Sequence, residues 1–178
     1  MMKKIKLKVR FSNMDVTYEY ATRADLPTIV AIYNQIIPSR LATADLDPVS
    51  VDSRQAWFDQ FDPNSRPIWL MKDGDKIAGW VSLESFYGRP AYHKTTEISI
   101  YIDENYRHQG LGQHALNFVF SQLDGLGIDA LVAFIFHHNI PSQGLFKKNG
   151  FEEWGHLPDV ALMDGQHRSL DILGRRFD

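Results

Sequence analysis

Residues 107–112 read RHQGLG, and no other stretch of the chain says as much about its architecture. This stretch follows an apolar strand pattern at residues 95–102 and opens an amphipathic helix pattern that runs to Leu126. The first backbone N–H groups of a helix lack partners inside the helix and carry partial positive charge, so they attract phosphate oxygens. A side chain at either glycine would block the anion or strain the backbone, and Arg107 adds a full positive charge. The stretch therefore predicts a phosphate-binding loop.

Glycine spacing alone does not identify which phosphate-containing ligand the loop binds. Residues 110–115 (GLGQHA) also match G-x-G-x-x-A, the fingerprint of dinucleotide-binding domains, and Asp129 lies near the place of its ribose-binding acid. That fingerprint should follow the first strand of a parallel βαβ unit through a tight turn. Here it lies in mid-chain after an antiparallel hairpin pattern, and the connection at 103–109 is long. No Lys-Ser/Thr pair follows the glycines, which excludes a P-loop.

The segments on either side of the loop predict one mixed α/β domain. Apolar and alternating patterns predict strands at 16–21, 68–71, 77–83, 95–102, 130–136, 151–156 and 169–176. Helices are predicted from Asp25 to Ile37, from Ser53 to Phe61, from the glycine loop to Leu126, and from Ile140 to Lys148. The order βααβββαβαββ indicates an antiparallel front half followed by a strand–helix–strand crossover.

Composition excludes several classes of function. The chain has 178 residues, no cysteine and a formal net charge of −3. This charge gives no basic surface for nucleic acid, and no apolar run approaches the length that spans a bilayer. The absence of cysteine excludes a disulfide scaffold and a thiolate metal site, and it fits a reducing cytoplasm, which is the expected location. The adjacent pair His137-His138 and the five scattered histidines do not have metal-ligand spacing with carboxylates, so we expect no metal site.

Residues 1–15 form an N-terminal extension to a domain at 16–178. In the extension Ile5, Leu7, Val9 and Phe11 alternate with lysine or arginine. The alternation suits an added edge strand, in which lysines discourage pairing with other molecules. Residues upstream of a natural start at Met14 are the equal alternative.

The order of these motifs resembles the GNAT superfamily of N-acetyltransferases. A strand, Arg-x-x-Gly-x-Gly, an amphipathic helix, a buried strand and then Asn-Ile-Pro-Ser before a short helix follow one another in the chain. The stretches ADLPTIVAIYNQII (24–37), RPAYHKTTEISIYI (89–102) and GLFKKNGF (144–151) look like the phosphinothricin acetyltransferase subfamily. The resemblance implies a GNAT-type, mostly antiparallel central sheet flanked by helices, and acetyl-CoA as co-substrate.

The resemblance also implies which residues bind acetyl-CoA. The backbone of the long central strand pairs with the pantetheine arm in such enzymes, and the glycine loop binds the pyrophosphate. Asn139 matches a residue that bonds the arm, with Ser142 nearby, although Asn139 also suits a plain helix N-cap. The implied contact residues are Ile100, Tyr101, Ile102, Arg107, His108, Gln109, Gly110, Leu111, Gly112, Gln113, Asn139 and Ser142.

Glu97 is the candidate catalytic base. An aliphatic ammonium has a pKa of roughly 10, so the nucleophilic free amine is scarce at neutral pH, and a nearby carboxylate can take its proton. Alternation puts Glu97, Ser99 and Tyr101 on one face of the strand, and the subfamily keeps a glutamate facing the acceptor. The plain alternative is a solvated strand glutamate. Many relatives have a tyrosine in the short helix as general acid; here the position is Phe146, so that role stays unassigned.

The expected function is acetyl transfer to the primary amine of a small molecule. The resemblance favours an L-amino acid or an analogue such as phosphinothricin or methionine sulfoximine. It makes Arg89, Tyr92 and His93 the candidate acceptor-binding residues, since an arginine fork suits a carboxylate or phosphinate. It also implies a homodimer. The alternatives are a non-catalytic acyl-CoA-binding module and a nicotinamide-dependent oxidoreductase.

Overall fold

A mixed sheet of eight strands organises the protein, in the order β1-β2-β3-β4-β5-β6-β8-β7. The structure is a computed structural model that describes residues 9–11 and 14–177. Every neighbouring pair of these strands is antiparallel except β5 and β6, which are parallel. The strands are β1 (Val9–Phe11), β2 (Met14–Tyr20), β3 (Ile68–Asp73), β4 (Lys76–Ser85), β5 (Thr95–Ile102), β6 (Ala130–Phe136), β7 (Glu152–Met163) and β8 (Gln166–Arg176). The predicted mostly antiparallel α/β fold is confirmed.

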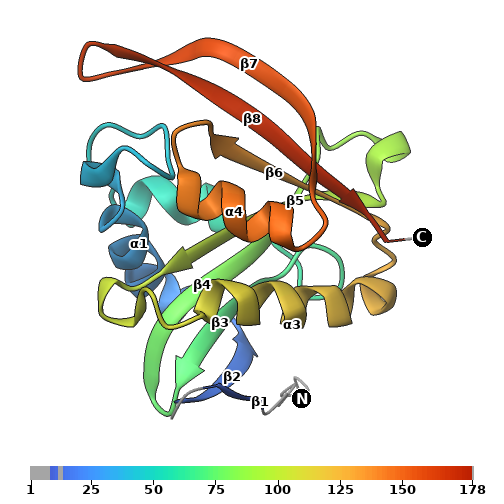
Figure 1. Cartoon of the computed structure of the whole chain (residues 1–178). Helices are drawn as coiled ribbons and strands as arrows, with labels where there is room; N and C mark the ends of the chain where they lie inside the picture. Colours follow the sequence, from blue (N-terminus) through green and yellow to red (C-terminus); the bar gives the residue numbers. More distant parts are fainter. Residues whose placement is uncertain (1–8, 12–13, 178) are drawn as a thin grey trace.

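Helices cover both faces of this sheet. They are α1 (Leu26–Asn34), α2 (Gln55–Phe58), α3 (Leu111–Leu126) and α4 (Ile140–Lys148), and from β2 onward the predicted order of elements is confirmed. The apolar side chains of α1 and α2 pack on one face of the sheet, and those of α3 and α4 pack on the other. Figure 1 shows α3 crossing in front of the sheet. None of the described helices is both long and apolar enough to cross a membrane.

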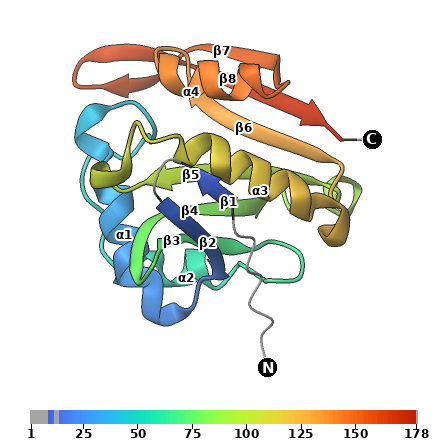
Figure 2. The same ribbon diagram turned by 60° about the horizontal axis from the view of Figure 1, so that its bottom comes forward.

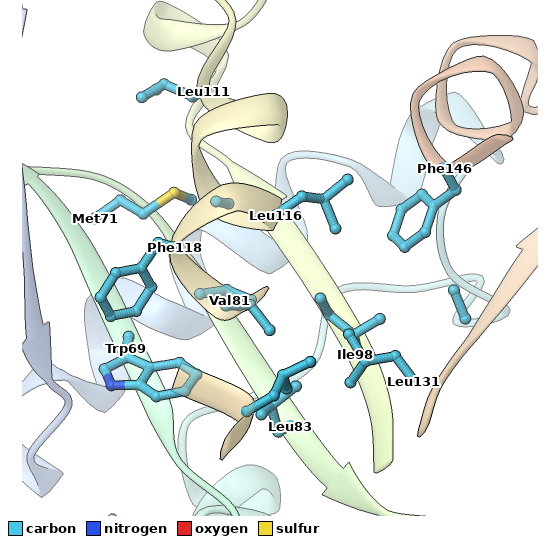
Figure 3. Close-up of a cluster of buried hydrophobic side chains, with 14 of the residues drawn as sticks. Trp69, Met71, Val81, Leu83, Ile98, Leu111, Leu116, Phe118, Leu131 and Phe146 are labelled. Carbon is cyan, nitrogen blue, oxygen red and sulfur yellow. The ribbon is translucent and has the colours of Figure 1, made fainter. Parts of the chain in front are cut away.

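The larger core lies between α3 and the sheet (Figure 3). Leu116 and Phe118 of α3 meet Trp69, Val81 and Leu83, which come from β3 and β4, and all five side chains are buried. Alternate residues of β3 and β4 face the α1 side instead. Because both faces of these strands are buried in their middle parts, their sequences are mostly apolar at 68–71 and 77–83.

The sheet opens between β5 and β6. Their parallel pairing is confined to Thr95–Glu97 of β5 and Ala130–Val132 of β6, whereas β6 continues to pair with β8 along its whole length. The backbone of β5 from Ile98 to Ile102 therefore has no strand partner on the β6 side. Figures 1 and 2 show the β6–β8–β7 part of the sheet on one side of α3 and the β1–β4 part on the other.

The C-terminal hairpin is longer than the sequence predicted. Strands were expected at 151–156 and 169–176, but β7 runs on to Met163 and β8 begins at Gln166. The Asp164-Gly165 pair turns the chain, with φ of 50° and 79°. Two positive φ values fit the type I′ turn that Asp-Gly favours in two-residue hairpins. This dipeptide was the local sign of a hairpin that the sequence interpretation missed.

Three further predictions needed correction at the ends of elements. The first helix ends at Asn34 instead of Ile37 because Pro38 has no N–H to donate to the carbonyl of Asn34, and the chain continues as a 3-10 turn at Ile37–Ser39. The Asp25 side chain makes no cap bond to α1 and instead accepts hydrogen bonds from the backbone and hydroxyl of Thr22. The second helix is the single turn of α2, preceded by a 3-10 turn at Asp52–Arg54.

The predicted N-terminal edge strand is present in part. Val9–Phe11 pair antiparallel with Met14–Val16 as β1. The other alternating residues, Ile5 and Leu7, lie outside the described residues.

Candidate active site

The glycine loop begins α3 in the conformation that an anion site needs. His108 and Gly110 both have positive φ, of 60° and 82°, and Gly110 is the N-cap of α3. The backbone N–H groups that follow Gly110 belong to the first turn, where a helix supplies no internal partner. A Cβ on Gly110 would touch nothing, so this position needs glycine for its φ. The loop therefore presents free donors at a helix N-terminus.

Gly112 has a different reason to be glycine. A Cβ built there would lie 2.8 Å from Cδ2 of Leu145, so α3 and α4 approach closely at this point. The predicted loop residues also hold the loop itself together. Nε of Arg107 donates to the carbonyl of Ile102 at 3.2 Å, and Nε2 of Gln109 donates to the carbonyl of Asn105 at 3.0 Å. Arg107 thus ties the loop to the end of β5.

A groove runs along the opening between β5 and β6. Six of the predicted acetyl-CoA residues line it together: Ile100, Tyr101, Ile102, Gly112, Asn139 and Ser142. The loop residues Arg107, His108, Gln109, Gly110, Leu111 and Gln113 lie at the adjoining start of α3, outside this lining. The groove has an unpaired strand edge on one side and a helix N-terminus at its end, which suits an extended chain ending in a phosphate.

Asn139 is buried at the N-cap of α4. Its Oδ1 accepts from the backbone N–H of Ser142 at 3.2 Å, and its Nδ2 donates to the carbonyl of Leu41 at 3.0 Å. The side chain therefore caps the helix and fastens the 38–48 loop to the groove. Its contact with acetyl-CoA stays a prediction.

A second pocket lies on the opposite face of β5. It is lined by Glu97, Ser99 and Tyr101 of β5 and by Glu84 and Trp80 of β4. The remaining lining residues come from α1, the segment 49–54 and α2, and they are Ile29, Val30, Tyr33, Val49, Arg54 and Trp57. The alternation predicted for β5 is thus confirmed. Ser99 and Tyr101 line both the groove and this pocket. The two spaces meet at that point of β5.

The second pocket is an unusual environment for carboxylates. Burial raises the pKa of Glu97 to about 7, and the nearby charge of Glu84 adds to this rise. The pKa of Glu84 is also raised by burial, although hydrogen bonding from Trp57 and the charge of Arg54 oppose the shift. A carboxyl group with a pKa near 7 can accept a proton at neutral pH and release it again.

Arg54 was missed by the sequence interpretation. It comes from the turn before α2 and lines the same pocket as Glu97. Its Nη2 donates to Asp45 at 2.6 Å, and its guanidinium lies 4.8 Å from the ring centre of Tyr33. The ion pair and the ring fix the fork in place. Only its position on the pocket-facing side of a short helical turn could have indicated it, and the predicted 53–61 helix gave no reason to prefer it.

Arg89, Tyr92 and His93 lie elsewhere. They line a hollow with Arg66 and Phe86 that shares no lining residue with the pocket of Glu97. The backbone carbonyl of His93 accepts from Nη2 of Arg66 at 2.7 Å, and its Nδ1 lies 2.8 Å from the carbonyl of Pro90. The structure does not bring these three residues to Glu97, and their role in acceptor binding stays a prediction.

The histidines are less scattered than the sequence suggested. His137 and His156 both meet Asp171, whose side chain is fully buried; their Nδ1 atoms lie 2.8 and 2.6 Å from its two oxygens. Gln143 donates to the same carboxylate at 2.7 Å. The three ionisable groups are close enough to resemble a metal cluster. Each Nδ1 is at hydrogen-bond distance from a carboxylate oxygen, so we interpret the cluster as a link between β6, α4, β7 and β8.

Comparison with known proteins identifies relatives of this architecture. The family model "Acetyltransferase (GNAT) family" matches residues 29–151. The chain is 48% identical over 163 residues to "Putative phosphinothricin acetyltransferase YwnH" of Bacillus subtilis, covering 91% of this chain and 99% of that protein. It is 31% identical to the "L-methionine sulfoximine/L-methionine sulfone acetyltransferase" of Pseudomonas aeruginosa, with 93% and 96% covered.

A solved structure agrees with these sequence relatives. The phosphinothricin acetyltransferase of Sinorhizobium meliloti in complex with AcCoA superposes with a TM-score of 0.84 at 25% identity, covering 91% of this chain and 88% of that one.

Proposed function

Because this chain belongs to the GNAT family and is an acetyl-CoA-dependent N-acetyltransferase of small molecules, we propose that its acceptor is an L-amino acid or an analogue such as phosphinothricin or methionine sulfoximine. The names of its relatives favour this class of acceptor. The two alternatives, a non-catalytic acyl-CoA-binding module and a nicotinamide-dependent oxidoreductase, find no support in those relatives.

One observation carries the proposal. The groove that suits acetyl-CoA and the pocket that holds Glu97 meet at Ser99 and Tyr101. A thioester at the inner end of the groove and an amine in the pocket would therefore be neighbours across β5. Bringing two reactants together in this way supplies much of the rate gain of a transferase.

The groups along β5 support a direct transfer. In our proposal the pantetheine arm pairs with the backbone of Ile100–Ile102, and the pyrophosphate lies at the first turn of α3. Glu97 takes one proton from the acceptor's ammonium group, and the free amine attacks the thioester carbonyl. The C–N bond forms, the C–S bond breaks, and the second proton lost by nitrogen neutralises the departing thiolate. A thiol of pKa about 8.5 leaves without a strong acid, so Phe146 at the family's tyrosine position is tolerable.

Two arginines are candidates for binding the acid group of such an acceptor. Arg54 lines the pocket of Glu97, whereas Arg89 lines the separate hollow. Of the donors on Arg54, only Nη2 has a hydrogen-bond partner among the described residues. We therefore favour Arg54 over the sequence-predicted Arg89. We expect Arg54→Ala to raise KM for acid-bearing acceptors far more than Arg89→Ala does. A larger rise in KM for Arg89→Ala would show that Arg89 binds the acid group, as the sequence predicted.

An acetyl-transfer screen tests the proposed acceptor. Release of free CoA thiol is followed with L-amino acids, phosphinothricin, methionine sulfoximine, polyamines and aminoglycosides as acceptors. We expect the highest kcat/KM for compounds with an acid group close to the primary amine. Transfer only to polyamines or aminoglycosides would reject this acceptor class while leaving the family intact.

We also infer that the protein is a cytoplasmic homodimer whose catalytic domain spans residues 16–178. The chain has no cysteine, which is compatible with a reducing compartment. The dimer is suggested by the family resemblance, and exposed apolar side chains on β7 are compatible with it.

A further inference from the structure

The acceptor pocket holds two carboxylates, and sequence analysis identified only one of them. Glu84 of β4 stands directly opposite Glu97 of β5 in the antiparallel register, and both line the pocket. Side chains directly opposed on one sheet face have Cβ atoms about 4.5–5.5 Å apart. The pair is therefore close enough for both carboxylates to contact one small group.

The pocket itself supplies little positive charge to the pair, although Arg66 lies with Glu84 on a neighbouring hollow. Among the described residues that line the pocket, Arg54 is the one cationic side chain, and it is already 2.6 Å from Asp45. The other ionisable groups facing Glu97 are the phenols of Tyr33 and Tyr101, whose pKa values are both raised. Phenols in that state carry no charge at neutral pH.

Both residues of the pair are partly withdrawn from the solvent that would screen them. This partial desolvation raises the pKa of both carboxyl groups, and the indole of Trp57 donates a hydrogen bond to Glu84. Like charges placed directly opposite one another on a sheet are destabilising, and low dielectric strengthens the repulsion. A cation that enters the pocket would offset the repulsion between the two carboxylates. An ammonium group supplies the charge and also three N–H donors, enough for both carboxylates.

We propose that Glu84 is a positioning residue that holds the acceptor's ammonium group together with Glu97 and sets Glu97 to receive its proton. This inference rests on the proposed function. Glu84 stays ionised through the reaction and consumes no proton. One N–H proton passes to Glu97, nitrogen attacks the thioester carbon, and the C–S bond then breaks with the second proton passing to sulfur. The acceptor is thereby required to present a cation.

The pH dependence of kcat/KM tests this role. In the wild type we expect the acidic limb near pH 7, where Glu97 loses its proton. Glu84→Gln removes a neighbouring negative charge, so the pKa of Glu97 falls and the limb moves to lower pH. The same variant loses a charged partner of the ammonium group, so KM for the acceptor rises about tenfold or more. Glu84→Asp retains the charge and should keep the limb near its wild-type position.

Matched variants separate the possible outcomes. Glu153→Gln removes an exposed carboxylate of β7, outside the pocket, and should change neither the limb nor KM. Acetyl-CoA affinity and the melting temperature establish that each variant is folded. An unchanged limb and unchanged KM in folded Glu84→Gln would overturn this inference. Failure of the wild type to acetylate any amine would instead overturn the proposed function.

Discussion

At the scale of a residue, Glu97 carries the sharpest prediction. Glu97→Gln keeps the shape of the side chain but cannot take the ammonium proton, so kcat/KM should fall by roughly 10²-fold or more. Because the pKa of Glu97 is raised to about 7, its basic form increases as pH rises through 7, and wild-type activity should increase over the same interval. Stopped assays across this range measure both effects.

The deficit of Glu97→Gln should shrink at high pH. Solvent then supplies free amine as pH approaches the pKa of the acceptor, and the need for a base decreases. Acetyl-CoA affinity should barely change, which separates lost chemistry from lost folding. Wild-type rates in this variant from about pH 6 to 9 would show that the proton leaves by another route.

Only some of the residues of the pocket could be predicted from the sequence. Glu97 and its face of the strand followed from alternation within residues 95–102, because a strand has a fixed period of two. Glu84 and Arg54 did not follow. Their closeness to Glu97 depends on the register of β4 against β5 and on the packing of a short turn, which are set by tertiary contacts.

At the scale of an element, the start of α3 needs glycine for two different reasons, a positive φ at Gly110 and a close approach of α4 at Gly112. Gly110→Val forces a β-branched residue into a positive φ of 82° and should weaken acetyl-CoA binding at least tenfold, or about 1.4 kcal/mol. Gly112→Val meets the flexible end of Leu145 and should weaken binding similarly by moving α3 from α4. Calorimetric titration with acetyl-CoA measures both. Unchanged affinity in folded Gly112→Val contradicts the assignment of the groove.

The hydrogen bonds of Asp171 should stabilise the packing of the C-terminal hairpin. Asp171→Asn weakens a buried acceptor of three hydrogen bonds, so the free energy of unfolding should fall by about 1–3 kcal/mol. Burial opposes ionisation, but hydrogen bonds from His156 and His137 outweigh it and lower the pKa of Asp171. A lowered pKa stabilises the fold above the unfolded value of about 3.9, and this is lost as pH falls through the folded value. Urea titrations at pH 7 and pH 3 measure both.

The same elements mark the limits of local sequence patterns. The bounds predicted for 95–102, 130–136 and 140–148 agree with β5, β6 and α4, since each segment has a clear period and a clear stop. The hairpin of β7 and β8 was underestimated because β7 is exposed along almost its whole length and shows no apolar alternation. Its length depends on pairing with β8.

At the scale of the whole molecule, the candidate active site is built from segments that are distant in the sequence. The groove takes residues from β5, β6, α3, α4 and the 38–48 loop, and the pocket takes residues from α1, the segment 49–54, α2, β4 and β5. Strand β5 is the shared wall. The opening of the sheet beside it follows from the short parallel pairing with β6, which the order of elements alone did not reveal.

The edge strand β7 carries exposed apolar side chains that suit a contact between two copies of the chain. Strand β7 ends the sheet, and Val160 and Leu162, two residues apart on it, are 57% and 59% exposed. Stable dimers bury roughly 800 Å² on each partner, with apolar side chains at the centre of the contact. We therefore expect sedimentation equilibrium at micromolar concentration to give twice the 20.5 kDa chain mass. Val160→Lys with Leu162→Lys should shift the protein toward monomer, because charges at the centre of such a contact would be buried without partners. Ala31→Lys, exposed on α1, serves as the matched control. A wild-type protein that sediments only as monomer contradicts the dimer, and a dimer that survives the β7 changes places the contact on another surface.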